Sequence, residues 1–279
     1  MKLLKPLFFY LILTSCALRG SKIEDAFKAL SIYDYFKAKK LFYPELSKSH
    51  KAAAAYGLAI IFYRTDNPFS QPDSASKYIT LSGNYFRSTR LQESYFNFKT
   101  DSVGIYALAD SIALKCYEKA LKTNTTKAFE DFILQNPYSH PVYKQYALKK
   151  RDQICFNVNQ YYNSSDSTLA CMLRYPQSYF YNELSLLLDK QLFEEKTAQK
   201  RPDDYIDFIK NNAKNKFIGQ AQDELFAIYR KNSDVQGLEF YVHNYPNTRF
   251  YNEAWKLLYA LTVKSYNNTD MVNLSLIHI

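Results

Sequence analysis

The chain has 279 residues and carries a formal net charge of +9 at pH 7. That length accommodates one large domain or two small ones. The six glycines are too scattered to form a phosphate-binding loop, and neither G-x-S-x-G nor H-E-x-x-H occurs in the sequence. These common signatures of nucleotide binding, serine hydrolysis and zinc proteolysis are therefore excluded.

The first residues carry a signal for export. Two lysines among the first five residues give a positive start, and residues 7–13 form an apolar run of seven. That run is too short to span a bilayer, which needs roughly 20 apolar residues, but it suits the core of a signal peptide. Residues 13–16 read Leu-Thr-Ser-Cys, which resembles the bacterial lipobox. The resemblance implies a signal peptide at residues 1–15 and acylation of the Cys16 thiol.

Lipidation at Cys16 would tether the chain to a membrane. Two or three acyl chains hold a protein stably, at roughly 0.8 kcal/mol per buried CH₂. Residues 16–21 are the predicted tether. Ala17 follows the cysteine and no acidic residue precedes Glu24, so the resemblance to lipoprotein sorting signals favours the outer membrane, facing the periplasm. An ordinary secretory signal, or a short anchor helix, with an incidental cysteine is the alternative.

The mature chain stays basic without its predicted signal peptide. Loss of Lys2 and Lys5 from the 36 basic residues leaves 34 against 27 acidic ones, a net charge of +7. The basic residues are dispersed in pairs such as Lys39-Lys40, a pattern typical of solvated helix faces. Nucleic acid is not expected as a partner outside the cytoplasm. Anionic glycans and lipid headgroups stay open as partners through a general electrostatic bias.

The second half of the chain contains an internal repeat of four copies. In each copy, two large apolar residues precede an Asn or Tyr, which is followed by Pro, or by Ala in the third copy: Pro137, Pro176, Ala213 and Pro246. A residue three positions before the apolar pair completes one helical stripe: Phe129, Thr168, Tyr205 and Leu238. The spacings of 39, 37 and 33 residues indicate helix-pair repeats, near the roughly 34 residues of tetratricopeptide arrays.

Each copy continues into a second helix with an apolar face, as the spacing of Ala221, Leu225 and Ile228 indicates. Two residues after each Pro or Ala stands a residue suited to capping that helix: Ser139, Ser178, Asn215 and Thr248. One helix pair cannot bury its own stripe. Neighbouring pairs are therefore expected to stack into a superhelix.

The first half of the chain follows the same plan less regularly. Residues 26–42 resemble a tetratricopeptide unit, with small residues where paired helices cross closely. The next helix is predicted over residues 52–63, followed by an insertion at 64–72 and a helix that starts near Asp73. Residues 82–103 show weak periodicity and are predicted to form a long connection. A further helix is predicted from about Ile105 to Lys122.

The lipobox and the repeats together resemble the tetratricopeptide-repeat lipoproteins of Gram-negative outer membranes. The resemblance implies an all-α fold, a right-handed solenoid of helical hairpins, with irregular helices at residues 22–122 and four helix-pair repeats at residues 123–266. It also implies a non-enzymatic scaffold or adaptor that binds an envelope protein in its groove. The alternative is a nutrient-binding lipoprotein that takes glycans or peptides and partners an outer-membrane transporter.

The remaining cysteines and histidines indicate no metal or cofactor site. Three cysteines follow Cys16, and no C-x-x-C spacing occurs. Cys171 falls on an apolar helix position and Cys116 beside one, so buried free thiols are expected in preference to a Cys155–Cys171 bridge. The four histidines are isolated in the sequence. These histidines are therefore interpreted as loop or capping residues.

Two pairs of adjacent carboxylates lie in polar stretches, at residues 194–195 and 203–204. Neighbours in sequence do not share a helix face, so they make poor acid–base pairs. Solvated charge is expected at both, and no catalytic residue is predicted.

Serines and aromatic residues leave two further questions open. Four Asp-Ser dipeptides precede a small, branched or apolar residue and so resemble an O-glycosylation sequon; their serines are Ser74, Ser102, Ser111 and Ser167. Helix capping is the favoured alternative for them. Most aromatic residues are expected in the core. Those at residues 179–181 and 250–251 are candidates for lining a groove.

The end of the chain carries a different kind of signal. Residues 267–279 form a predicted tail, and residues 274–279 resemble the translation of a transposase adapter used in shotgun sequencing. No polar capping helix follows the last repeat, although solenoids need one. The native protein is therefore expected to continue past about Asn273. A genuine short tail that folds back is the alternative.

Overall fold

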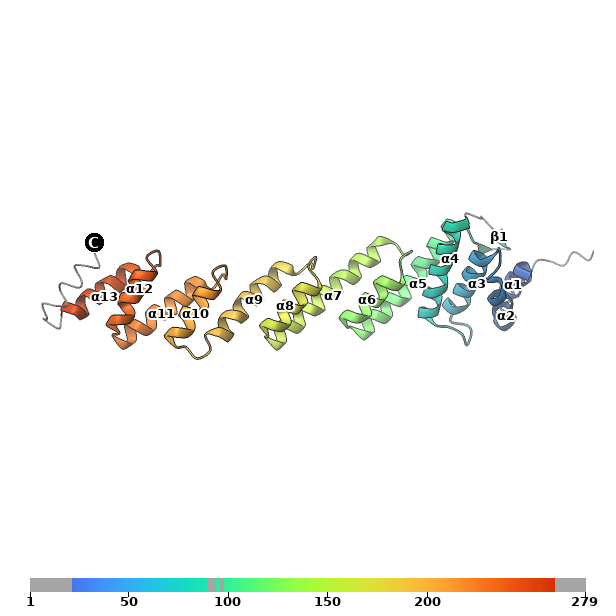
Figure 1. The fold of residues 1–279 in the computed structure, drawn as a ribbon. Helices are drawn as coiled ribbons and strands as arrows, with labels where there is room; N and C mark the ends of the chain where they lie inside the picture. Colours follow the sequence, from blue (N-terminus) through green and yellow to red (C-terminus); the bar gives the residue numbers. More distant parts are fainter. Residues whose placement is uncertain (1–21, 90–93, 96–97, 264–279) are drawn as a thin grey trace, which may run out of the picture. The chain divides into compact units, whose positions relative to one another are not determined.

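A computed structural model describes residues 22–89, 94–95 and 98–263 of the chain (Figure 1). The predicted signal peptide, Cys16, the tether and the tail at residues 267–279 lie outside these residues. The described part is almost entirely helical, which confirms the all-α prediction. Within it, no helix combines the length and apolar character needed to cross a membrane. The described residues form two compact units, divided between Leu148 and Lys149.

The first unit contains α1 (Lys22–Ser31), α2 (Tyr35–Glu45), α3 (Lys51–Tyr63), α4 (Pro72–Thr89), β1 (Ser94–Tyr95), β2 (Phe98–Lys99), α5 (Ser102–Thr123) and α6 (Thr126–Gln135). Consecutive helices pack against one another, and the two short strands pair antiparallel. The next helix, α7 (Pro141–Tyr162), begins in this unit and ends in the second.

The core of the first unit is centred on α3, whose residues 53–62 are all buried. Phe27 of α1 and Phe42 of α2 meet edge to face beside it, with ring centroids 4.9 Å apart. Gly57 makes this crossing possible, because a Cβ atom at that position would lie 2.2 Å from the Phe42 ring. The small residues noted in the sequence therefore do mark a close approach of helices.

The predicted long connection at residues 82–103 is wrong over its first part, because α4 continues to Thr89. The buried face of α4 uses small polar residues, which weakens the apolar periodicity. The Ser82 hydroxyl donates a hydrogen bond to the carbonyl of Ala52. Gly83 lies against the ring of Tyr138, where a Cβ atom would be 2.8 Å from a ring carbon. The predicted boundaries near residues 63 and 72 are confirmed.

The second unit continues with α8 (Ser165–Arg174), α9 (Tyr181–Lys196), α10 (Pro202–Asn211), α11 (Ile218–Asn232), α12 (Val235–Asn244) and α13 (Tyr251–Val263). The first helices of the four predicted repeats, α6, α8, α10 and α12, each have ten residues. The spacing between their first residues is the spacing that the sequence predicts. Their predicted stripe residues are all buried: Phe129, Thr168, Tyr205 and Leu238.

The same two-residue turn precedes each of these ten-residue helices. Two residues before the helix lies a residue with a left-handed backbone, at φ between 48° and 53°: Asn124, Asn163, Lys200 and Ser233. The next residue is the N-cap, and three of the four caps accept a backbone N–H through their side chains: Thr125, Ser164 and Asp234. Tyr33 and Asp34 form the same turn before α2. The repeated unit therefore includes the turn before each ten-residue helix as well as the buried stripe within the helix.

The residues predicted to cap the second helices do not occupy the cap positions. Those helices begin later, and the polar side chains stabilise the turn instead. Ser178 accepts a hydrogen bond from the N–H of Phe180, and Asn215 accepts one from Phe217. Ser139 and Thr248 donate to carbonyls three residues back. The connections span five or six residues, which is longer than the sequence pattern suggested.

In the second unit, phenylalanines stack between successive long helices. The stacked pairs are Phe156–Phe180, Phe193–Phe217 and Phe226–Phe250, with centroids 5.6, 5.6 and 5.0 Å apart. The separation of the two partners along the sequence is the same in all three pairs. Two candidate groove aromatics, Phe180 and Phe250, are therefore engaged in stacks between helices.

Cys155 and Cys171 form a disulfide, with Cα atoms 6.5 Å apart, so the expectation of free thiols is wrong for this pair. Cys155 lies on the face of α7 that packs against the Cys171 cluster of α8. The sequence placed both residues in helices but did not give the register in which the helices meet. Cys116 is a buried free thiol, as expected.

The buried stripe predicts the cost of truncating its side chains. Leu225→Ala should lower the free energy of unfolding by about 2–5 kcal/mol, because Leu225 is fully buried among helices α10–α13. Urea unfolding at equilibrium measures the change. Leu173→Ala is the matched control, since Leu173 is 73% exposed and its truncation should cost less than about 0.5 kcal/mol. Equal costs for the two variants would contradict the packing.

Candidate functional site

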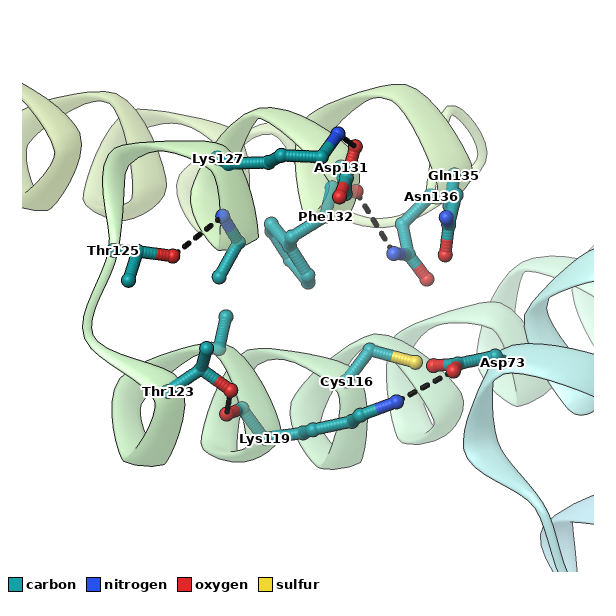
Figure 2. Close-up of a pocket in the computed structure, with 12 residues that line it drawn as sticks. Asp73, Cys116, Lys119, Thr123, Thr125, Lys127, Asp131, Phe132, Gln135 and Asn136 are labelled. Carbon is teal, nitrogen blue, oxygen red and sulfur yellow. Dashed lines mark hydrogen bonds and ion pairs between the residues drawn. The ribbon is translucent and has the colours of Figure 1, made fainter.

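The candidate site is a pocket of about 350 Å³ in the first unit, between α5 and α6 and the start of α4 (Figure 2). This volume lies at the lower end of the range for small-molecule sites, roughly 300–1,000 Å³. Ala120, Ala128 and Phe132 supply apolar lining, whereas the remaining lining residues are mostly polar. Phe132 belongs to the apolar pair of the first repeat copy and is buried, so the pocket opens beside the core of the helix pair.

Two ion pairs border the pocket. Lys119 of α5 contacts Asp73 at 2.5 Å, and Lys127 contacts Asp131 one turn along α6 at 3.1 Å. Figure 2 shows the Lys119 side chain extended along the pocket toward Asp73. All four side chains are substantially exposed, so each pair contributes about 0–1 kcal/mol. The two lysines and two aspartates have no net charge together, and they offer a ligand both cationic and anionic contacts.

Buried hydrogen bonds fix the end of the pocket where α6 meets α4. The Ser76 hydroxyl donates to the Gln135 carbonyl at 2.7 Å and to Asn136 Oδ1 at 2.9 Å. Asn136 in turn donates from Nδ2 to the carbonyl of Phe132. Because Ser76 and Asn136 are buried, these bonds hold the C-terminal end of α6 in place. This end of the pocket is therefore preformed.

The Cys116 thiol lines the pocket, and its environment suppresses its reactivity as a nucleophile. Burial raises its pKa to about 11, with a further increase from Asp73 and an opposing effect from Lys119. Its Sγ lies 3.6 Å from the Pro72 carbonyl, to which it donates. A thiol with that pKa is almost wholly protonated at pH 7, whereas the thiolate is the nucleophile. The pocket thus offers polar contacts for binding.

Sequence analysis did not find this pocket. Lys119 and Asp73 are 46 residues apart and come from different helices, so no local pattern connects them. Of the pocket residues, Asp73 and Cys116 had been singled out for other reasons, and Phe132, Gln135 and Asn136 belong to the first copy of the repeat. The thiol was expected to be buried and free, which the structure confirms.

The candidate glycosylation serines all lie in helices, and capping explains only part of the pattern. Asp101 caps α5 directly before Ser102 by accepting the N–H of Gly104. Ser74 and Ser167 lie in the first turns of α4 and α8. Ser111 is different, because it lies inside α5 and donates to the Ala107 carbonyl. The capping interpretation is wrong for that dipeptide.

The adjacent carboxylates have structural contacts. Glu195 accepts hydrogen bonds from the backbone N–H and the hydroxyl of Ser165, at the start of α8. Asp204 accepts hydrogen bonds from the guanidinium and the backbone N–H of Arg201, and the guanidinium bond holds the pKa of this carboxyl below its usual range. His140 accepts the Val142 N–H, in keeping with a loop role. Among the residues that the structure describes, no three metal-ligating side chains lie close enough to hold an ion.

The cysteines predict a simple labelling pattern for the mature protein carrying Cys16→Ser. Iodoacetamide should leave the native protein unmodified at pH 7.5, because Cys116 is buried with a raised pKa and the other two cysteines are bonded. After unfolding without reductant, Cys116 alone should react. Mass spectrometry of the digest should show residues 155 and 171 in one linked peptide. Alkylation of either residue under these conditions would contradict the disulfide.

Comparison of the chain with protein-family models, with curated proteins and with solved structures finds no match in any of the three. The resemblance to tetratricopeptide-repeat lipoproteins therefore rests on the lipobox residues and the repeated helix pairs of this chain alone.

Proposed function

We propose that the chain is a lipid-anchored, non-enzymatic scaffold of the cell envelope, built as a right-handed tetratricopeptide-like solenoid that binds a partner protein. The observation that carries this proposal is the repetition of one structural unit. A left-handed residue, an N-cap and a ten-residue helix recur four times, at the spacing seen in the sequence. Stacked helix pairs of this period are typical of proteins that present an extended binding surface.

The disulfide supports export from the cytoplasm. Bonds such as Cys155–Cys171 form and persist in oxidising compartments, including the bacterial periplasm, and are rare among cytosolic proteins. This agrees with the lipobox at residues 13–16, which is independent of the disulfide in sequence. We infer an outer-membrane lipoprotein anchored at Cys16 and facing the periplasm.

Exposed leucines supply candidate contacts for a protein partner. Leu134 and Leu173 occupy the same position in α6 and α8, and they are 79% and 73% exposed. Large apolar side chains held in water at equivalent repeat positions contribute little to the fold, because neither packs in its core. They are suited to contact an envelope protein, which would bury them.

The anchor predicts a change in fractionation. The variant Cys16→Ser is exported behind an ordinary cleavable signal, so that the substituted residue becomes the first of the mature chain. It should move from the membrane fraction to the washed supernatant, because acyl chains supply the stable anchoring. The wild-type chain, processed in parallel, should stay with the outer membrane through the same high-salt wash. Retention of the variant after that wash would rule out Cys16 as the anchor.

The scaffold predicts a protein neighbour at the exposed leucines. A photo-crosslinking amino acid at Leu134 or Leu173 should give a discrete adduct with an envelope protein in intact cells. The same probe at Lys190, an exposed polar position on α9, serves as the control for random collisions. Adducts of equal yield at all three positions, or none at the leucines, would contradict a specific protein partner.

A further inference from the structure

The turn between α1 and α2 carries an exposed apolar patch formed by Ile32, Tyr33 and Phe36, which we call the α1–α2 patch. These side chains are 68%, 62% and 68% exposed, although each is large and apolar. Figure 1 shows the two helices side by side, joined at this turn. Such a concentration of exposed aromatic and aliphatic side chains at one tip indicates a surface that contacts something other than water.

The patch is held in position by its neighbours. The Phe36 ring packs edge to face on Phe69, with centroids 4.8 Å apart. The Tyr33 ring contacts the Tyr35 ring edge to face. The Arg64 guanidinium lies 5.1 Å from the centre of the same Tyr33 ring. Tyr35 is itself fixed, because its hydroxyl accepts a hydrogen bond from Arg64 and contacts both oxygens of Asp66. The patch is therefore prepared in advance of binding, which lowers the entropic cost of ordering it.

Basic side chains surround the patch. Lys37 and Lys40 are exposed on α2, and Lys39 lies over the Phe69 ring at 3.8 Å. With Arg64 they make four cationic groups around the tip. Two carboxylates lie close by, and both are engaged: Asp34 accepts the Lys37 N–H as the α2 N-cap, and Asp66 accepts the Tyr35 hydroxyl. Aromatic and aliphatic tips within a basic surround are the composition of interfacial membrane contacts.

The position of the patch relative to the predicted anchor favours a membrane over a protein as its occupant. The patch follows α1, whose ten residues are about 15 Å long. Six residue steps separate Cys16 from the start of α1, and they can span at most about 20 Å. A lipid at Cys16 can therefore enter the same bilayer surface that the patch touches. Lysines near such a surface are attracted to anionic headgroups.

We propose that the α1–α2 patch inserts into the headgroup region of a phospholipid bilayer and is the second contact of this chain with its membrane. This proposal rests on the proposed lipid anchor at Cys16. The acyl chains hold the protein on the membrane, and the patch fixes the orientation of the first helices against the surface. Its own affinity is weak and reversible, so it does not replace the anchor.

The experiment uses the unlipidated mature protein carrying Cys16→Ser, so that only the patch contributes to binding. Its partition onto vesicles of phosphatidylcholine and phosphatidylglycerol, mixed in a three-to-one ratio, is measured by flotation at millimolar lipid. Ile32→Ser with Phe36→Ser should reduce the partition coefficient at least tenfold. Tyr161→Ser with Tyr162→Ser removes comparably exposed side chains elsewhere, 82% and 70% exposed, and should leave binding unchanged. Circular dichroism of each variant verifies that the helices remain.

Two further arms decide between lipid and other occupants. Lys37→Gln with Lys40→Gln should weaken binding to the anionic vesicles severalfold and leave binding to pure phosphatidylcholine unchanged. Failure of the unlipidated protein to bind either vesicle would overturn the proposal, as would undiminished binding of the Ile32/Phe36 variant. Sedimentation velocity tests whether a second copy of the chain covers the patch. A dimer that the Ile32/Phe36 variant abolishes would also overturn the membrane proposal. The fractionation of the Cys16 variant judges the anchor separately.

Discussion

A ten-residue helix cannot stand alone in water, and this constraint governs how the protein is built. Isolated helices shorter than about 12–15 residues are marginal, because the cost of the first turn is spread over few hydrogen bonds. Each of the four short helices α6, α8, α10 and α12 therefore depends on burying one stripe against its neighbours. Phe129 and Tyr205 show how complete that burial is. The helices exist as pairs because neither partner is stable without the other's apolar face.

The turn before each short helix determines where that helix starts. A left-handed residue reverses the chain in two residues, and the following cap satisfies a backbone N–H that the helix leaves free. Asparagine tolerates this backbone, as at Asn124 and Asn163, but Lys200 adopts it as well. The Lys200 N–H donates a hydrogen bond to the Thr197 carbonyl at 3.0 Å, which helps to hold this turn. In the second unit the Phe193–Phe217 stack and its two equivalents add a contact between successive long helices.

Two surfaces of the first unit are candidates for contact with other molecules. The pocket between α5 and α6 is bordered by ion pairs and holds a protonated thiol, so it offers polar and charged contacts to a ligand. The α1–α2 patch has exposed rings and an excess of cations. The proposed anchor at Cys16 and the proposed protein-binding repeats would divide attachment from recognition along the sequence.

The sequence by itself determined the helical class, the repeat spacing, the buried stripe and the turns at Pro137, Pro176 and Pro246. These features are local, because periodicity, proline and capping chemistry act within a few residues of one another. It also predicted the lipobox, which no described residue tests. The length of α4 was missed because Ser82 and Gly83 form a buried face without large apolar side chains.

Only the tertiary structure decided which side chains meet across helices. The Cys155–Cys171 bond depends on the register between α7 and α8, and the Lys119–Asp73 pair joins helices 46 residues apart. The exposure of Ile32 and Phe36 likewise depends on which face of each helix its neighbours cover. A sequence pattern gives the apolar face of one helix, whereas pairing, register and exposure arise from how several helices share their burial.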